Sequence, residues 1–132
     1  MKKSKSGIKE QEADRAARKV RRHAHAPYSK YKVGAAVIAS GRIFSGCNVE
    51  NASFPAGLCA ERSAVAAAVS AGCRRITYLA ICVAGAPVPP CGMCLQVLSE
   101  FAGSDLPVSL IGRGKSVRTS LGDLLPHRFR PD

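Results

Sequence analysis

At residues 59–61 the sequence is Cys59-Ala60-Glu61, and at residues 90–94 it is Pro90-Cys91-Gly92-Met93-Cys94. Three thiolates at this spacing suit a tetrahedral zinc ion. A structural zinc site normally closes with four protein ligands, whereas three ligands leave a fourth position for water. A carboxylate beside that water, here Glu61, can move its protons. The two stretches therefore predict a catalytic Zn²⁺ centre with Cys59, Cys91 and Cys94 as ligands.

The same spacing predicts where two helices begin. Cys91 and Cys94 are three residues apart, so both thiols fall on one side of a first helical turn. Glu61 follows Cys59 by two residues, and the pair can act together only if Cys59 stands at or before a helix N-cap. Two helix N-termini aimed at the metal offset part of the thiolate charge, and Arg62 can donate a hydrogen bond to a ligating sulfur.

Working outward from these helices, apolar periodicity predicts a layered α/β/α domain. An uninterrupted apolar run at residues 76–83 is typical of an interior strand covered on both faces. A hairpin is expected around the turn Ser40-Gly41. The predicted strands lie at residues 31–39, 42–46, 76–83 and 106–111, and the predicted helical segments at residues 8–25, 59–71, 91–101 and 121–125. Pro27 is expected to end the first helix, and residues 1–7 are expected to be disordered.

Length and charge indicate one domain with a basic leader. The 132 residues fit a single core. We divide the chain into residues 1–22, a leader with part of the first helix, and residues 23–132, the domain. The net charge is +11, and residues 1–22 hold nine basic and three acidic residues. A basic leader is more often a solvated helix face than a recognition arm, so nucleic acid is not the expected partner.

The sequence also favours a particular compartment. No apolar run approaches the roughly 20 residues that span a bilayer, and no apolar segment follows the basic start of the chain. We therefore expect a soluble, cytoplasmic protein without a membrane partner. In a reducing compartment its six cysteines are expected to be metal ligands and buried thiols rather than disulfides.

A polar run, Asn48-Val49-Glu50-Asn51, follows the second predicted strand. Such a run is usually only a loop. An Asn and a Glu two residues apart at a strand end can also both point into a cleft and hydrogen-bond a polyol. Asn48 and Glu50 are therefore candidate binding residues.

With these residues in place, the sequence closely resembles the small three-cysteine zinc cytidine deaminases, from residue 26 to about residue 130. The deaminase signature is known from nucleobase deaminases. The matching segments are residues 26–31, 33–36, 46–53, 59–62, 90–94, 96–98 and 124–126. Two positions depart from the family pattern, since Leu95 replaces an arginine that follows the last ligand in most relatives and Phe54 replaces a tyrosine.

The resemblance implies a cytidine-deaminase-like fold with a five-stranded mixed sheet, and a homotetramer whose active sites are completed by neighbouring subunits. It implies zinc on the three cysteines and Glu61 as the proton shuttle. The implied substrate contacts are Tyr31 as the pocket aromatic, Asn48 and Glu50 at the ribose 3′-hydroxyl, Ala60 with its backbone at the pyrimidine, and Phe129 stacking over a base from an adjacent subunit.

The implied activity is zinc-dependent hydrolysis of cytidine and deoxycytidine to uridine and deoxyuridine plus ammonia, in pyrimidine salvage. Two alternatives remain open from the residues. One is deamination of a related aminopyrimidine nucleoside such as blasticidin S, against which the retained Asn48 and Glu50 argue. The other is nucleic-acid binding or editing, which only the basic leader supports, because a short chain without an insertion fits a small pocket better than a polynucleotide channel.

Overall fold

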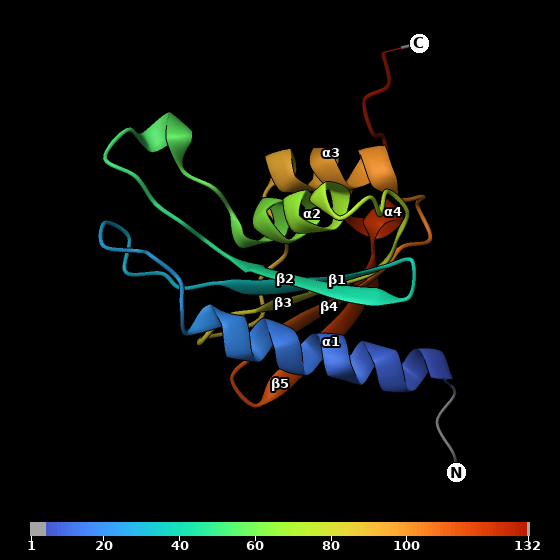
Figure 1. Ribbon diagram of the computed structural model, residues 1–132, viewed down its shortest axis with the longest axis horizontal. Helices are drawn as coiled ribbons and strands as arrows, with labels where there is room; N and C mark the ends of the chain where they lie inside the picture. Colours follow the sequence, from blue (N-terminus) through green and yellow to red (C-terminus); the bar gives the residue numbers. More distant parts are fainter. Residues whose placement is uncertain (1–4, 132) are drawn as a thin grey trace.

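The computed structural model describes residues 5–131, which form a mixed five-stranded sheet with helices on both faces (Figure 1). The strands are β1 (Gly34–Ala39), β2 (Arg42–Cys47), β3 (Ile76–Cys82), β4 (Pro107–Gly112) and β5 (Lys115–Ser120). The helices are α1 (Lys5–Arg21), α2 (Ala60–Ser70), α3 (Gly92–Phe101) and the single turn α4 (Leu121–Leu124), with a short 3-10 helix at Phe54–Ala56. The predicted three-layer α/β/α architecture is confirmed.

The sheet has the order β2-β1-β3-β4-β5. β3 pairs with β1 antiparallel and with β4 parallel, and the outer pairs β1–β2 and β4–β5 are antiparallel. All residues of β1 are buried, and in β3 only Thr77 is exposed. The apolar run at β3 was predicted to be an interior strand, and this is confirmed, because β3 is a central strand covered on both faces.

Each face of the sheet has its own core. α2, α3 and α4 cover one face, where Leu79 and Ile81 of β3 pack with Leu98 of α3 and Leu121 of α4. α1 covers the other face with Ala13 and Ala17, both fully buried. These small side chains allow α1 to lie close to β1, where the backbone of Gly34 approaches the carbonyl of Ala17. The site-bearing helices α2 and α3 are thus held side by side on one face.

The first helix differs from its prediction. α1 begins at Lys5, so residues 5–7 are helical rather than disordered, and the rest of that prediction, residues 1–4, lies outside the described residues. α1 also ends at Arg21, well before Pro27. The cause is a tertiary contact: the His25 N–H donates to the Asn48 carbonyl at 3.0 Å, and the Glu50 N–H donates to the His25 carbonyl at 2.8 Å. These bonds draw the chain away from the helix axis.

The sheet also contains a strand that residue patterning did not find. β5 has the sequence KSVRTS and is mostly exposed. A polar edge strand of this kind carries no apolar alternation, so only the family resemblance predicted a fifth strand. The division of the chain after residue 22 stays a prediction. Among residues 5–131, no helix is long and apolar enough to cross a membrane.

Candidate active site

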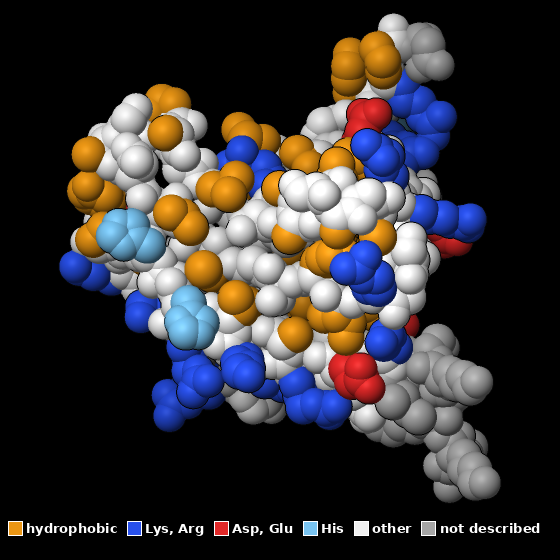
Figure 2. Space-filling model, viewed as in Figure 1, with side chains coloured by type: hydrophobic (Ala, Val, Ile, Leu, Met, Phe, Trp, Pro, Cys, Tyr) orange, Lys and Arg blue, Asp and Glu red, His pale blue; other side chains and the backbone are white. Residues whose placement is uncertain are grey.

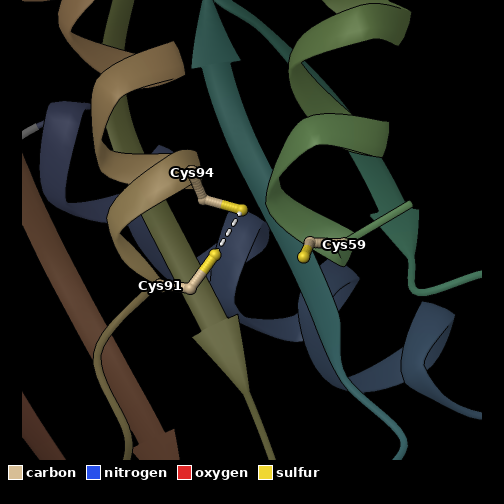
Figure 3. Close-up of side chains that lie close together, drawn as sticks. All are labelled: Cys59, Cys91 and Cys94. Atoms are coloured by element: carbon tan, nitrogen blue, oxygen red, sulfur yellow. Dashed lines mark hydrogen bonds between the residues drawn. The ribbon is translucent and has the colours of Figure 1, made fainter. Parts of the chain in front are cut away.

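The three cysteines of the two motifs meet at the N-termini of α2 and α3. Cys59 is the N-cap of α2, and Cys91 is the N-cap of α3, with Cys94 in the first turn. Their sulfur atoms point toward one another and all lie within 4.8 Å, with Cys91 Sγ and Cys94 Sγ 3.4 Å apart (Figure 3). The two helix starts predicted from cysteine spacing are therefore confirmed.

The cluster fits a zinc ion. Tetrahedral coordination with Zn–S bonds of about 2.3 Å places two sulfurs about 3.8 Å apart. The observed separations fall around this value. Within the described part of the chain, the group that could hold a metal consists of these three thiols alone, and a thiolate donor set is one that zinc prefers. All six cysteines are free thiols, and of the three outside the cluster Cys73 and Cys82 are buried, as expected, whereas Cys47 is only half-buried.

Glu61 lies in the first turn of α2, beside the cysteines. Its side chain is only 6% exposed. Burial raises the pKa of the Glu61 carboxyl above its ordinary value, while hydrogen bonds from its own backbone and from Cys94 oppose the rise. A buried carboxyl that binds a proton more tightly than in water, beside a group of thiols that could hold a metal, is suited to accept and release protons in a reaction.

Arg62 is directed at the sulfur cluster. Its Nη2 donates to the Gly57 carbonyl at 3.2 Å and to Cys59 Sγ at 3.8 Å. Its Nε is buried and has no hydrogen-bond partner among the described residues. The hydrogen bond to Cys59 raises the pKa of the Arg62 guanidinium further. A fixed positive charge at this place offsets the negative charge of the thiolates.

A cavity of about 270 Å³ opens beside the cysteines. Cys59 and Cys91 lie at this cavity, and other side chains on its wall are Tyr31, Asn48, Glu50, Ala60 and Glu61. The structure therefore brings together four of the five predicted substrate contacts and the predicted proton carrier. The wall is formed by α2, by the segment after β2, by the loop before β1, by β3 and by the segment before α3, which explains why its members are dispersed in sequence.

Asn48 and Glu50 are bonded to the loop before β1. The Asn48 side chain donates to the Tyr31 carbonyl at 2.7 Å and accepts from the Val33 N–H at 2.8 Å. Glu50 Oε1 accepts from the N–H groups of Tyr28 and Ser29 at 3.0 and 3.1 Å, and Oε2 accepts from the Ser29 hydroxyl. The Ser29 hydroxyl bond is the main cause that lowers the pKa of Glu50, so this carboxylate is held ionised.

Ser29 is a site residue that our sequence reasoning missed. Its hydroxyl accepts the Tyr31 N–H at 3.0 Å, a local turn of the kind Ser forms with the residue two positions on. This local turn could have been predicted from the sequence, because a serine follows Pro27 in a loop. The bond to Glu50 joins residues far apart in the chain and had no local signal.

Phe129 is the one predicted contact that the structure does not bring to the cavity. Its side chain is 70% exposed, and its carbonyl accepts from Gln96 Nε2 of α3 at 3.2 Å.

The structure also shows where the two residues that depart from the family pattern lie. Leu95 is 7% exposed within the core under α3, and Phe54 is 74% exposed, edge-on to the Tyr28 ring at 5.7 Å. An arginine could not take the place of Leu95 without entering this core.

Comparison with known proteins agrees with the geometry. Residues 8–110 match the family model for the cytidine and deoxycytidylate deaminase zinc-binding region. The chain belongs to this family. A curated relative, a cytidine deaminase of Sporosarcina psychrophila, is 44% identical over 115 residues, covering 85% of both chains. A cytidine deaminase of Mycobacterium tuberculosis is 46% identical over 112 residues, covering 83% of this chain and 80% of the relative.

Solved structures of family members share the fold. The crystal structure of cytidine deaminase from Burkholderia pseudomallei superposes with a TM-score of 0.85 at 43% identity, covering 90% of this chain and 98% of that one. The crystal structure of cytidine deaminase from Mycobacterium tuberculosis gives a TM-score of 0.79 at 39% identity, covering 91% and 96%. The cytidine-deaminase fold class predicted from the sequence is confirmed, and with it zinc as the cofactor of this enzyme family.

Proposed function

We propose that the protein is a cytidine deaminase that converts cytidine and deoxycytidine, with one water, to uridine and deoxyuridine plus ammonia. The observation that carries the proposal is the cavity itself. A buried carboxyl, Glu61, and the thiols of Cys59 and Cys91 line the same space as the polar side chains of Asn48 and Glu50. Reactive groups and sugar-binding groups therefore face one small substrate.

The chemistry divides between the metal and Glu61. Cys59, Cys91 and Cys94 would hold zinc, which supplies a Lewis acid that activates water for attack on C4 of the base. Glu61 takes the proton that the attacking water loses and returns it to the ring nitrogen. It then takes the second proton of that water from the new C4 hydroxyl and gives it to the amino group, so that the C4–N bond breaks, ammonia leaves and the C4 carbonyl forms. Its burial excludes bulk water from the proton path.

Asn48 and Glu50 are assigned to the ribose 3′-hydroxyl, Tyr31 to the wall beside the base, and the Ala60 backbone to the pyrimidine. Arg62 is assigned to the sulfur of Cys59, where its donated hydrogen bond stabilises the thiolate. Both cysteine-bearing helix N-termini add partial positive charge at the metal group. We also propose a cytoplasmic location, which the free thiols of the cluster support, because thiols persist in a reducing compartment.

A homotetramer and a role in pyrimidine salvage complete the proposal. The cavity lacks its predicted stacking aromatic, since Phe129 lies exposed beside α3, and a neighbouring copy would supply it. Hydrophobic side chains also gather on the lobe formed by residues 26–33 and 48–58 (Figure 2), where Tyr28 and Phe54 are exposed. Light scattering on the purified protein tests this assembly, and a monomeric mass would contradict it.

The function is tested by ammonia release from the zinc-loaded protein. Cytidine and deoxycytidine should be turned over, whereas Glu61→Ala prepared in parallel should be nearly inactive. Blasticidin S and a single-stranded cytosine-containing oligonucleotide serve as competing substrates. Turnover of either of these without turnover of the free nucleosides would overturn the proposal.

A further inference from the structure

Ser29 links two walls of the cavity through its hydroxyl. The Ser29 Oγ–H donates to Glu50 Oε2, and the same oxygen accepts the Tyr31 N–H at 3.0 Å. Glu50 and Tyr31 both line the cavity, and they come from different segments of the chain. Within the described structure, Ser29 is the one side chain that hydrogen-bonds to the Glu50 carboxylate.

These hydrogen bonds leave the Glu50 carboxylate with one free lone-pair site, which points in a fixed direction. An ionised carboxylate offers about four lone-pair sites. Oε1 uses two of them for the Tyr28 and Ser29 N–H groups, and Oε2 uses one for the Ser29 hydroxyl. A ligand hydroxyl can therefore approach chiefly at the remaining site on Oε2. The two N–H bonds hold Oε1, and the bond from the Ser29 hydroxyl holds Oε2, so this hydroxyl completes the fixing of the carboxylate and of the direction of its remaining site.

We propose that Ser29 is a positioning residue for sugar recognition, which aims Glu50 at the sugar hydroxyl of the substrate and holds Tyr31 beside it. This inference rests on the proposed function, in which Glu50 binds the 3′-hydroxyl. Ser29 itself touches no substrate atom in this role. Its contribution is preorganisation, because a carboxylate already fixed in its bound rotamer loses little freedom when the ligand arrives.

The effect of removing the Ser29 hydroxyl should depend on the sugar of the substrate. A nucleoside with a 3′-hydroxyl uses the free lone-pair site on Glu50, so it should depend on Ser29. A 2′,3′-dideoxynucleoside offers no such donor, so it should be indifferent to the Ser29 hydroxyl. A merely structural role of Ser29 would instead affect both substrates alike.

The test compares Ser29→Ala with wild type on cytidine, deoxycytidine and 2′,3′-dideoxycytidine. We expect KM for the first two to rise about tenfold, the loss typical of one hydrogen bond to a charged group, with kcat changed less than about twofold. The dideoxy substrate should show less than about a twofold change. Ser29→Thr, which keeps the hydroxyl, should restore KM, and Ser116→Ala on the exposed strand β5 is the matched control. An equal loss on all three substrates would overturn the inference.

A double-mutant cycle tests the route through Glu50. In a Glu50→Ala background, Ser29→Ala should raise KM no further, because the carboxylate that it aims is absent. Additive effects would contradict the inference. Calorimetric binding of uridine and 2′,3′-dideoxyuridine makes the same comparison without turnover. If the wild-type protein bound the nucleosides without deaminating them, the proposed function would be overturned. The binding comparison would still decide whether Ser29 positions Glu50.

Discussion

Glu61 is unusual among the described residues, where it and Ser109 are the buried polar or charged side chains. Burying a carboxyl costs stability, so its position favours a chemical role over a structural one. We expect Glu61→Ala to lower kcat by about 10²- to 10⁴-fold, the usual contribution of general acid–base catalysis. Zinc content should be unchanged, because the ligands are untouched. Ammonia release with metal analysis checks both, and a variant retaining full activity would remove Glu61 from the proton path.

Arg62 supplies a side-chain positive charge that contacts the sulfur of Cys59, one of the three thiols that could hold the metal. Leu95, which follows Cys94, is buried in the core and adds no second positive charge there. We expect Arg62→Ala to weaken zinc binding about 10- to 100-fold, as loss of a group that orients a metal ligand typically does. Competition with a chromogenic chelator measures it, with exposed Arg75→Ala as control. Unchanged affinity would mean that the helix N-termini suffice to balance the thiolates.

At the scale of elements, the placement of α2 depends on Gly46 of β2. A Cβ at Gly46 would lie 2.6 Å from the Ala64 backbone nitrogen and 2.6 Å from Ser63 Oγ. Backbone cannot yield as a flexible side chain can, so Gly46→Ala should displace α2 and with it Cys59 and Glu61. We expect destabilisation of about 1–3 kcal/mol and reduced zinc content.

The matched control is Gly85→Ala, since nothing lies within 4 Å of a Cβ at that position. Denaturant unfolding and metal analysis compare the two variants. If Gly46→Ala matched Gly85→Ala in both measurements, the close packing of α2 on β2 would not be what sets the site geometry.

The attachment of α1 to the sheet should depend on pH through Asp14. The Tyr78 hydroxyl donates to Asp14 Oδ1 at 2.6 Å. Burial raises the pKa of Asp14, and this hydrogen bond opposes the rise, as do Arg18 and Arg118, while Glu10 adds to it. In Tyr78→Phe the opposing bond is lost, so the folded-state pKa of Asp14 rises further. The folded variant then gains more than wild type from protonation as the pH falls.

We therefore expect Tyr78→Phe to cost about 1 kcal/mol near pH 7, where Asp14 is ionised, and less near pH 4.5. Thermal unfolding at the two pH values measures this difference. Exposed Tyr28→Phe is the control and should be neutral at both. A deficit that stays constant or grows on acidification would show that the Tyr78 hydroxyl does not stabilise the ionised carboxylate.

The elements differ in how far sequence could predict them. The starts of α2 and α3 followed from cysteine and glutamate spacing, because helix geometry is local. β5 and the end of α1 did not, since a polar edge strand lacks a period and the bridge from His25 to the segment after β2 is a tertiary contact. The three-cysteine group that could hold a metal was likewise indicated by local spacing. The bond between Ser29 and Glu50 was not, because it depends on how two loops meet.

Over the whole molecule, charge and packing divide α1 into two sides. Ala13 and Ala17 are buried against the sheet, and the basic residues Arg15, Arg18 and Lys19 are exposed. Figure 2 shows Lys and Arg side chains along the face over this helix. Among the described residues, part of the basic excess of the leader is therefore carried by the outer side of a helix that completes the fold, consistent with a solvated helix face.

The stability of the whole fold should depend more on bound zinc than on any other single feature. Cys59 belongs to α2, and Cys91 and Cys94 belong to α3, so a metal bound by all three ties the two helices of one layer together.

A ligand that binds only the folded chain stabilises it by about 4 kcal/mol at a thousandfold excess over Kd. We expect a strong chelator to lower Tm by about 10 °C or more and to abolish activity, both restored by added zinc. The difference in Tm should shrink as the pH falls, because protons compete with the metal for the thiolates and weaken its binding. Cys47→Ser, which lies outside the cluster, should respond to chelator as wild type does, whereas Cys94→Ser should be insensitive. A wild-type Tm that ignores the chelator would show that the packed core alone holds α2 and α3 in place.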